Sequence, residues 1–313
     1  MNAVVIDRDA AGDPLVAGVA AQLRQLRAAS QSSRYRGAAP RLPSREAIEG
    51  IVENLVAALY PRHFGPPGLS AREADAFVVR TLTQTLPILK REVDLAIALE
   101  THQTRGESEA RRLGADDIVK GFFAALPRVR ATLDKDARAG FANDPSAKSI
   151  DEVIFCFPGV AAVMRHRLAH ELYRLGVPLI ARIVAEIAHA LAGVDIHPGA
   201  EIGEGFFIDH GTGVVIGETA VIGRNVRLYQ AVTLGAKRFE VDGDGALRKN
   251  YPRHPIVEDD VVIYAGATIL GRVTIGRGSS IGGNVWLTES VPPGSRVTQA
   301  KTQATLFDSG EGI

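Results

Sequence analysis

The sequence predicts an α+β protein in which an N-terminal helical bundle is followed by a C-terminal parallel β-helix of hexapeptide repeats. Three observations predict this class. Apolar residues recur every three or four positions between residues 44 and 193, they recur every six positions after Gly193, and a polar segment at residues 236–255 interrupts the second pattern once. With 313 residues the chain is long enough for two domains, each with a core.

The N-terminal part of the chain divides into two stretches. Residues 1–43 are rich in Ala, Arg, Ser and Gln and show little apolar periodicity, so we predict a flexible segment without a core role. From residue 44 to 193 the pattern is helical, with Ile48, Ile51 and Leu55 on one face. We predict that these residues form the helical domain.

Four prolines are expected at junctions between successive helices of that domain, because proline disrupts the interior of a helix. They are Pro87, Pro127, Pro158 and Pro178. Gly193 is expected at the end of the last helix.

After Gly193 an aliphatic residue returns every sixth position over some ninety residues, which an ordinary sheet does not do. Three such hexads make one triangular coil of a parallel β-helix, with the aliphatic residues stacked inward. The repeat predicts a β-helix over residues 194–295, with an excursion loop at 236–255 and a C-terminal tail at 296–313. The repeated positions are Ile196, Ile202, Ile208 and Val214, then Ile216, Ile222, Leu228 and Leu234, and finally Ile263, Ile269, Ile275, Ile281 and Leu287.

Composition limits the partners and the compartment. Lys plus Arg total 36 and Asp plus Glu total 36, so charge gives no argument for a nucleic acid or an anionic membrane. The single cysteine, Cys156, excludes an intramolecular disulfide and is expected to be buried as a small hydrophobic residue. The N-terminus does not resemble a signal peptide, and Arg182 and Glu186 interrupt the most apolar segment. We expect a cytoplasmic protein without a membrane anchor.

Polar residues that break the repeat are the candidates for chemistry. One coil of three hexads has 18 residues, and Asp195 precedes His210 by 15, so the two lie on successive coils roughly 4.8 Å apart. Histidine ordinarily titrates near neutrality and suits removal of a proton from an attacking alcohol, while a carboxylate on the far ring nitrogen fixes its tautomer. We predict His210 as general base and Asp195 as its orienting residue. Without a suitable nucleophile nearby, acyl transfer would be direct, within a ternary complex.

Three runs give the chain a family resemblance: DIHPGAEIGEGFFIDHGTGVVIGETAVIG, VTLGAK and PRHP. With these runs, the stretch from about Asp144 to Pro293 resembles the serine O-acetyltransferases among the hexapeptide-repeat acyltransferases. The long excursion loop is similar to that of a long-loop subgroup. The resemblance implies a left-handed β-helix and the reaction of acetyl-CoA with L-serine to O-acetyl-L-serine and CoA, the first step of cysteine biosynthesis. It also implies a homo-trimer, or a hexamer of paired trimers, with active sites between neighbouring β-helices.

The resemblance also assigns roles to individual residues. It implies the dyad of His210 in DHGTG and Asp195 in VDIHP, and no metal. Residues with charges complementary to serine match positions that hold its carboxylate and its amino group; they are Arg253 and His254 for the carboxylate, and Asp144 and Asp209 for the amino group. Acetyl-CoA would contact small residues and one cation, namely Gly235, Ala236, Ala265, Gly283 and Lys301.

Two regulatory partners follow from the same resemblance. The chain ends in SGEGI, like family tails whose terminal isoleucine docks into O-acetylserine sulfhydrylase, so Ile313 is predicted to bind that enzyme. L-cysteine is expected as a feedback inhibitor, because it resembles serine.

Three other functions remain open from the sequence. The first is a hexapeptide acetyltransferase for another small acceptor, which a panel of acceptors would distinguish. The second is a β-helix carbonic anhydrase, which needs three metal-binding histidines. By number alone, His197, His210 and His254 could be those ligands. The third is a non-catalytic regulator of O-acetylserine sulfhydrylase, which measurable acetyl transfer would exclude.

Overall fold

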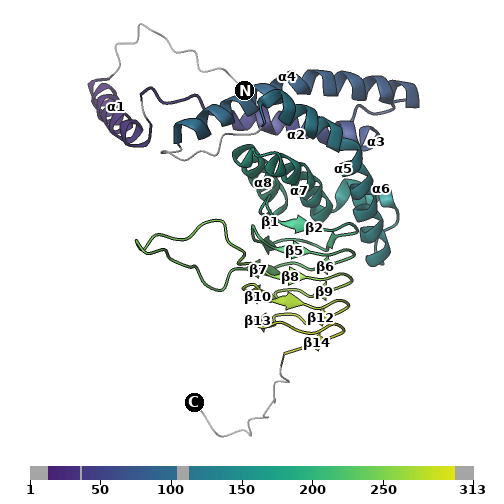
Figure 1. Ribbon diagram of the computed structural model, residues 1–313. Helices are drawn as coiled ribbons and strands as arrows, with labels where there is room; N and C mark the ends of the chain where they lie inside the picture. The colour runs from purple at the N-terminus through teal and green to yellow at the C-terminus, as the bar shows by residue number, and fades with distance from the viewer. Residues whose placement is uncertain (1–12, 36, 104–112, 300–313) are drawn as a thin grey trace, which may run out of the picture.

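The structure is a computed structural model that describes residues 13–35, 37–103 and 113–299. A helical layer lies on one end of a stack of flat coils, and a long loop projects from the stack (Figure 1). The fold is α+β with a parallel β-helix, as the repeat predicts, and the β-helix is left-handed, as the family resemblance implies. The predicted positions of Lys301 and Ile313 lie outside the described residues.

The helices of the described residues lie between Pro14 and Ala192. They are α1 (Pro14–Arg34), α2 (Arg45–Leu59), α3 (Pro61–Phe64), α4 (Ala71–Gln103), α5 (Ala115–Asn143), α6 (Ile150–Cys156), α7 (Pro158–Arg174) and α8 (Pro178–Ala192). Ser44 caps α2 by accepting a hydrogen bond from the backbone N–H of Ala47, and α8 ends at Gly193 in the left-handed conformation.

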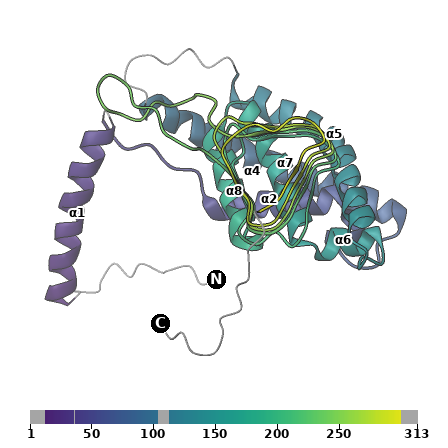
Figure 2. The same ribbon diagram turned by 90° about the horizontal axis from the view of Figure 1, so that it is seen from below.

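Helix α1 was not predicted from the sequence. None of its residues is buried, and it stands apart from the other helices (Figures 1 and 2). Cys156 closes α6 and is exposed, so the prediction that it is buried is wrong. The helix presents Val153 and Ile154 to the core instead. Within the described residues, no helix is both long enough and apolar enough to cross a membrane.

The prolines mark helix junctions at only two of the four predicted places. Pro158 and Pro178 occupy the first turns of α7 and α8, where the missing N–H has no helical partner. Pro87 and Pro127 lie inside α4 and α5. Both helices continue because the residues just beyond each proline are buried in the core, and that packing outweighs a lost hydrogen bond.

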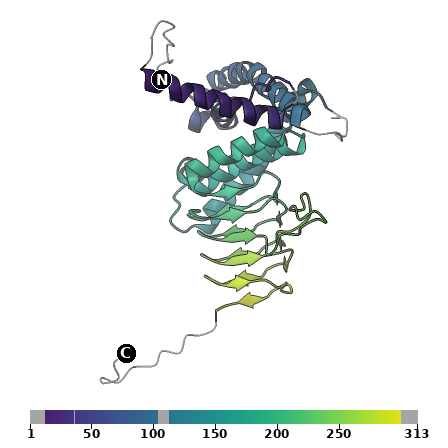
Figure 3. The same ribbon diagram turned by 90° about the vertical axis from the view of Figure 1, so that its left-hand side faces the viewer.

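The β-helix has three parallel sheets, one on each side of the triangular coil. Sheet A has the order β1-β4-β7-β10-β13, sheet B has β11-β8-β5-β2, and sheet C has β14-β12-β9-β6-β3. The strands are β1 (Asp195–Ile196), β2 (Glu201–Ile202), β3 (Phe207–Ile208), β4 (Val215–Ile216), β5 (Val221–Ile222), β6 (Arg227–Leu228), β7 (Thr233–Gly235), β8 (Ile256–Val257), β9 (Val262–Ile263), β10 (Thr268–Leu270), β11 (Thr274–Ile275), β12 (Ser280–Ile281), β13 (Trp286–Leu287) and β14 (Arg296–Val297). Seen from below, the coils overlie one another (Figure 2), and from the side their strands lie one beneath another (Figure 3).

Two corners of the triangle matter for function. The C–A corner joins sheet C to sheet A through residues 209–214, 229–232, 264–267 and 282–285 in successive coils. The A–B corner joins sheet A to sheet B through residues 197–200 and 217–220, and then through the excursion loop 236–255. Thus the C–A corner precedes each strand of sheet A and the A–B corner follows it, so the two corners lie at opposite ends of these strands.

The first coil is two residues longer than the repeat predicts. Ile196 pairs with Ile216, whereas Ile216 pairs with Leu234 at the ordinary coil length. Val214 therefore is not in the aliphatic register of Ile208, as the sequence pattern suggested, although its side chain is buried. The extra residues fall in the C–A corner, in the segment 209–213.

A buried ion pair joins the helical layer to the first coil. Arg167 of α7 donates to both oxygens of Asp136 of α5 and to the carbonyl groups of Ile202 and Gly203. Asp136 also accepts from the backbone N–H of Phe206. These bonds satisfy both charges and fix the end of the β-helix against α5 and α7.

Candidate active site at two corners of the β-helix

His210 lies in the lengthened C–A corner of the first coil. Its backbone has φ of 59°, a left-handed conformation that elsewhere in these turns is adopted by residues such as Asn225 and Asn284. Its side chain is 71% exposed. A histidine in a turn position favoured by asparagine or glycine, with a solvent-facing ring, is free to act on a ligand.

Both predicted serine-binding carboxylates, Asp144 and Asp209, lie near His210. Oδ1 of Asp209 is 3.9 Å from Nε2 of His210, and Oδ2 of Asp209 is 3.4 Å from a guanidinium nitrogen of Arg227. Asp144, at the C-terminal end of α5, accepts hydrogen bonds from Ser146 that lower the pKa of its carboxyl, and the nearby His210 and Arg227 lower it further. The structure therefore gathers Asp144, Asp209 and His210 at one corner.

Asp195 lies beside this corner but does not contact the imidazole. Its backbone N–H donates to the carbonyl of Val214, and Gly213 donates to the carbonyl of Gly193, so the corner segment packs against the start of β1. Within the described part of the chain, no hydrogen bond or ion pair joins Asp195 to His210. The dyad stays a prediction, and it requires the carboxylate of Asp195 to turn toward His210.

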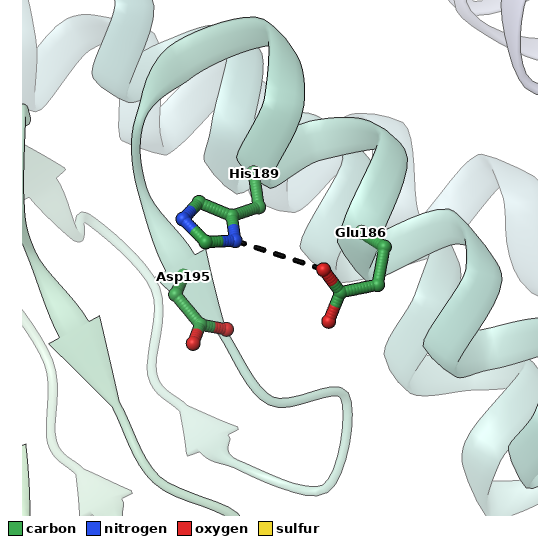
Figure 4. Close-up of side chains that lie close together, drawn as sticks. All are labelled: Glu186, His189 and Asp195. Atoms are coloured by element: carbon green, nitrogen blue, oxygen red, sulfur yellow. Dashed lines mark ion pairs between the residues drawn. The ribbon is translucent and has the colours of Figure 1, made fainter.

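The carboxylate of Asp195 faces the last turn of α8 instead (Figure 4). Ligand-type atoms of Glu186, His189 and Asp195 all lie within 4.8 Å of one another, and these side chains are types that bind divalent cations. Glu186 is already paired with Arg182 at 2.7 Å and with His189 at 3.6 Å. These ion pairs account for the arrangement of Glu186 and His189 without a cation.

The A–B corner holds the other predicted serine ligands, Arg253 and His254. A guanidinium nitrogen of Arg253 donates to Oε2 of Glu218 at 2.6 Å, and the hydroxyl of Tyr173 donates to Oε1 of the same carboxylate at 3.1 Å. Burial alone would raise the pKa of Glu218, but these two hydrogen bonds lower it. Glu218 is thus an ionised anchor that fixes Arg253.

His254 is held in one tautomer. Its Nδ1 accepts from the backbone N–H of Thr219 at 3.1 Å, and its ring packs so closely on Gly217 that no Cβ fits there. Burial and the neighbouring Arg253 lower the pKa of His254 to about 4, so the ring is neutral at pH 7. Because Nδ1 accepts, the proton lies on Nε2, which is a hydrogen-bond donor.

The residues predicted to contact acetyl-CoA divide between the same two corners. Ala265 and Gly283 lie in the C–A corner below His210. Gly235 ends β7 and Ala236 opens the excursion loop, so both lie at the A–B corner with Arg253. Among the described residues, no hydrogen bond or ion pair links the His210 side to the Arg253 side.

Three further residues at these corners, Glu218, Tyr173 and Arg227, were not predicted from the sequence. Glu218 follows Gly217 in the run IGETAVIG, where its charge breaks the repeat, and that signal was available. Tyr173 lies in an ordinary amphipathic helix and Arg227 at an outward strand position, so their roles depend on the register of the coils.

Comparison with known proteins first identifies the class. Residues 254–289 match the family model described as bacterial transferase hexapeptide (six repeats). This match, together with the triangular coils and the polar corners, is typical of the hexapeptide-repeat transferases.

Matches over most of the chain identify the family. The chain is 54% identical over 276 residues to a plasmid serine acetyltransferase of Synechococcus elongatus, covering 87% of this chain and 86% of the relative. The structure of serine acetyltransferase 1 of Entamoeba histolytica in complex with L-cysteine has a TM-score of 0.69 at 32% identity, covering 90% of this chain and 97% of that one. The serine acetyltransferase of Neisseria gonorrhoeae in complex with serine has a TM-score of 0.53 at 26% identity, covering 82% and 96%. The chain belongs to the serine acetyltransferase family and is an acyltransferase.

Proposed function

We propose that this protein transfers the acetyl group of acetyl-CoA to the hydroxyl of L-serine, releasing O-acetyl-L-serine and CoA, at the start of cysteine biosynthesis. One observation carries the proposal. The two corners offer the charges that a serine zwitterion needs, with Asp144 and Asp209 beside His210 at one corner and Arg253 beside His254 at the other.

His210 is the proposed general base. Its Nε2 would take the proton of the serine hydroxyl as the hydroxyl oxygen attacks the thioester carbonyl, and it would return the proton to the departing thiolate of CoA. Asp209, 3.9 Å away, would hold the serine amino group next to the base. Asp195 would orient the ring after its carboxylate turns from His189 toward His210. The transfer needs no acyl-enzyme.

The A–B corner would bind the serine carboxylate. Arg253 supplies the positive charge, and Nε2–H of neutral His254 supplies a second donor. Glu218 and Tyr173 hold Arg253 in place from behind. A neutral His254 also keeps the donor pattern constant across physiological pH.

We call the C–A corner with His210 and the A–B corner with Arg253 the two half-sites. A complete site would need two chains, because each chain carries its half-sites at opposite ends of the strands of sheet A. If the C–A corner of one chain faces the A–B corner of the next, a closed ring of three chains gives three complete sites. We therefore propose a homo-trimer, with pairing of trimers through the helical domain as the route to a hexamer. The neighbouring chain would also cover the exposed ring of His210 and exclude water from it.

Acetyl-CoA would lie in the same cleft, with its pantetheine arm along Ala265 and Gly283 of one chain and Gly235 and Ala236 of the neighbour. Small residues let the arm approach the backbone of the coils. The cation of Lys301 is proposed for a phosphate of CoA.

L-cysteine differs from L-serine only by sulfur in place of oxygen, so the same half-sites would bind it. A related E. histolytica enzyme has been solved in complex with L-cysteine, which supports inhibition of this chain by that amino acid. The terminal Ile313 is proposed to dock into O-acetylserine sulfhydrylase. Loss of sulfhydrylase binding after deletion of Ile313 tests this, and unchanged binding would reject it.

The structure disfavours the carbonic anhydrase alternative. Nδ1 of His197 accepts from the backbone N–H of Gly199, as Nδ1 of His254 accepts from Thr219. Each ring then carries its proton on Nε2 and has no lone pair there for a metal. An acyltransferase for a sugar or an uncharged alcohol would not need both charge-complementary corners.

Thiol release from acetyl-CoA, measured with and without L-serine, tests the proposed activity. We expect release that depends on serine, and much slower release with acceptors that lack either the amino group or the carboxylate. Release at the same rate without an acceptor, or a preference for an uncharged alcohol, would contradict the proposal.

A further inference from the structure

A column of side chains runs down the C–A corner below His210. Ile208 pairs with Leu228 and Leu228 with Ile263, so the residues that follow them, Asp209, Tyr229 and Tyr264, occupy equivalent positions in successive coils. The rings of Tyr229 and Tyr264 are stacked, with centroids 5.1 Å apart and planes inclined by 12°. This separation matches the roughly 4.8 Å distance between coils, so the backbone itself imposes the stack.

Arg227 lies against the upper ring of this stack. Its guanidinium carbon is 4.7 Å from the ring centroid of Tyr229 and 5.8 Å from that of Phe207, and its side chain is 19% exposed. Such contacts favour a cation and limit the directions in which the guanidinium can point.

The side chain of Arg227 makes few hydrogen bonds for a cation that is largely buried. Among the described residues, the only hydrogen bond of its side chain runs from a terminal nitrogen to Oδ2 of Asp209, while its Nε is buried without a partner. An unsatisfied buried donor lowers stability, and folding alone gives no reason to keep a guanidinium there. Its single acceptor, Asp209, therefore indicates its role.

The two oxygens of Asp209 have different surroundings. Oδ2 is bound by Arg227, and Oδ1 is directed to the side of His210, 3.9 Å from its Nε2. We propose that Arg227 is a positioning residue for recognition of the serine amino group, because it holds one oxygen of Asp209 and leaves the other beside the base. This inference rests on the proposed serine acetyl transfer and assigns part of its specificity.

Arg227 also sets the net charge of the corner. Asp144 and Asp209 carry two negative charges, Arg227 carries one positive charge, and the remainder is one negative charge, which a single ammonium group neutralises. Without Arg227 the two carboxylates would lose this compensating charge, and their mutual repulsion would favour protonation of one of them. The guanidinium thus sets both the direction and the net charge of the amino-group subsite.

The test replaces Arg227 by methionine in the full-length protein and measures both substrates. For Arg227→Met we expect the KM for L-serine to rise about 10- to 100-fold, the loss expected for one misplaced charge-assisted hydrogen bond. The KM for acetyl-CoA should change less than about twofold. 3-Hydroxypropionate, which is serine without the amino group, should inhibit wild type and variant with equal inhibition constants.

A matched control is Arg224→Met on the same coil, because Arg224 also pairs with an aspartate, Asp259, at 3.1 Å, away from both corners. It should keep both KM values. If the methionine variant does not fold, Arg227→Gln, which keeps an N–H donor without the charge, should show the same split. An unchanged serine KM, or equal weakening of serine and 3-hydroxypropionate, would overturn the inference. A wild-type protein without serine-dependent thiol release would instead reject the proposed function.

Discussion

His210 combines two properties that a residue serving only the fold would not combine. A left-handed backbone at a residue other than glycine costs on the order of 1 kcal/mol, and a largely exposed ring contributes little packing in return. Asparagine tolerates the same backbone, as Asn225 and Asn284 show. Asparagine is therefore the substitution that removes the base and keeps the turn.

For His210→Asn we expect kcat to fall about 100- to 10,000-fold, which is the usual contribution of a positioned general base. The thermal unfolding midpoint should stay within a few degrees of wild type. Thiol release at saturating substrates measures the first quantity and circular dichroism the second. A variant with near-normal turnover would remove His210 from the mechanism.

His254 gives a prediction for stability against pH. Its pKa in the folded protein is about 4, below the ordinary value of 6.5, so the unfolded chain binds its proton first as the pH falls. Stability from this residue is complete above pH 6.5 and is lost between about pH 6.5 and pH 4. Between pH 7 and pH 5 the loss is about 2 kcal/mol per chain.

The free energy of unfolding is measured by denaturant for wild type and His254→Gln, each at pH 7 and pH 5. Buried His166, whose pKa is also lowered by burial, contributes over the acid range in both proteins and cancels. The variant should lose about 2 kcal/mol less than wild type over this interval. Equal losses in the two proteins would mean that His254 is not neutral and enclosed as described.

At the scale of elements, the junction between α5, α7 and the first coil depends on Asp136 and Arg167. Asp136→Ala leaves the buried guanidinium of Arg167 without its partner, and we expect a loss of about 3–5 kcal/mol. Glu204→Ala is the control, because the ion pair of Glu204 with Lys135 also joins α5 to the first coil but is half exposed. It should cost less than about 1 kcal/mol. Similar losses in the two variants would contradict the assigned importance of burial.

The order of the elements was largely predictable from the sequence, because each coil must bury an aliphatic residue every six positions. The register of the first coil was not, since both Val214 and Ile216 are buried and only the pairing of Ile196 with Ile216 locates the insertion. Helix α1 was missed because it buries nothing and so has no core pattern to detect.

The candidate site was predictable as a set of residues but not as two half-sites. Polar residues that interrupt the repeat, such as His210 and Arg253, are visible in the sequence. Which corner each residue occupies depends on two features of the β-helix. These are the two extra residues of the first coil and the point at which the excursion loop leaves the third coil. Arg227 was hidden, because an outward arginine on a strand is usually a solvated surface residue.

At the scale of the whole molecule, the surface between the half-sites is itself suited to association. The outer face of sheet A carries Val215 and Trp286, which are 37% and 70% exposed in the single chain. Apolar side chains on a flat sheet face, bordered by two polar corners, are typical of a surface that another subunit covers. A trimer around this face would bury these residues and join each C–A corner to an A–B corner.

Mixed assembly tests this arrangement directly. His210→Asn disables the C–A half-site and Arg253→Ala disables the A–B half-site, so neither variant alone should be active. The two variants are co-expressed in equal amounts and assemble at random. A site is then intact only if its C–A corner comes from an Arg253→Ala chain and its A–B corner from a His210→Asn chain. About one quarter of the sites should then be restored, giving about a quarter of wild-type turnover.

Two variants damaged at the same corner, His210→Asn and Asp209→Asn, give the control, because no pairing of their chains produces an intact C–A half-site. Their mixture should be no more active than the average of the separate proteins. If sites formed within one chain, the first mixture would behave like the control. Recovery near one quarter in the first mixture and none in the second would instead require that serine and acetyl-CoA meet between subunits.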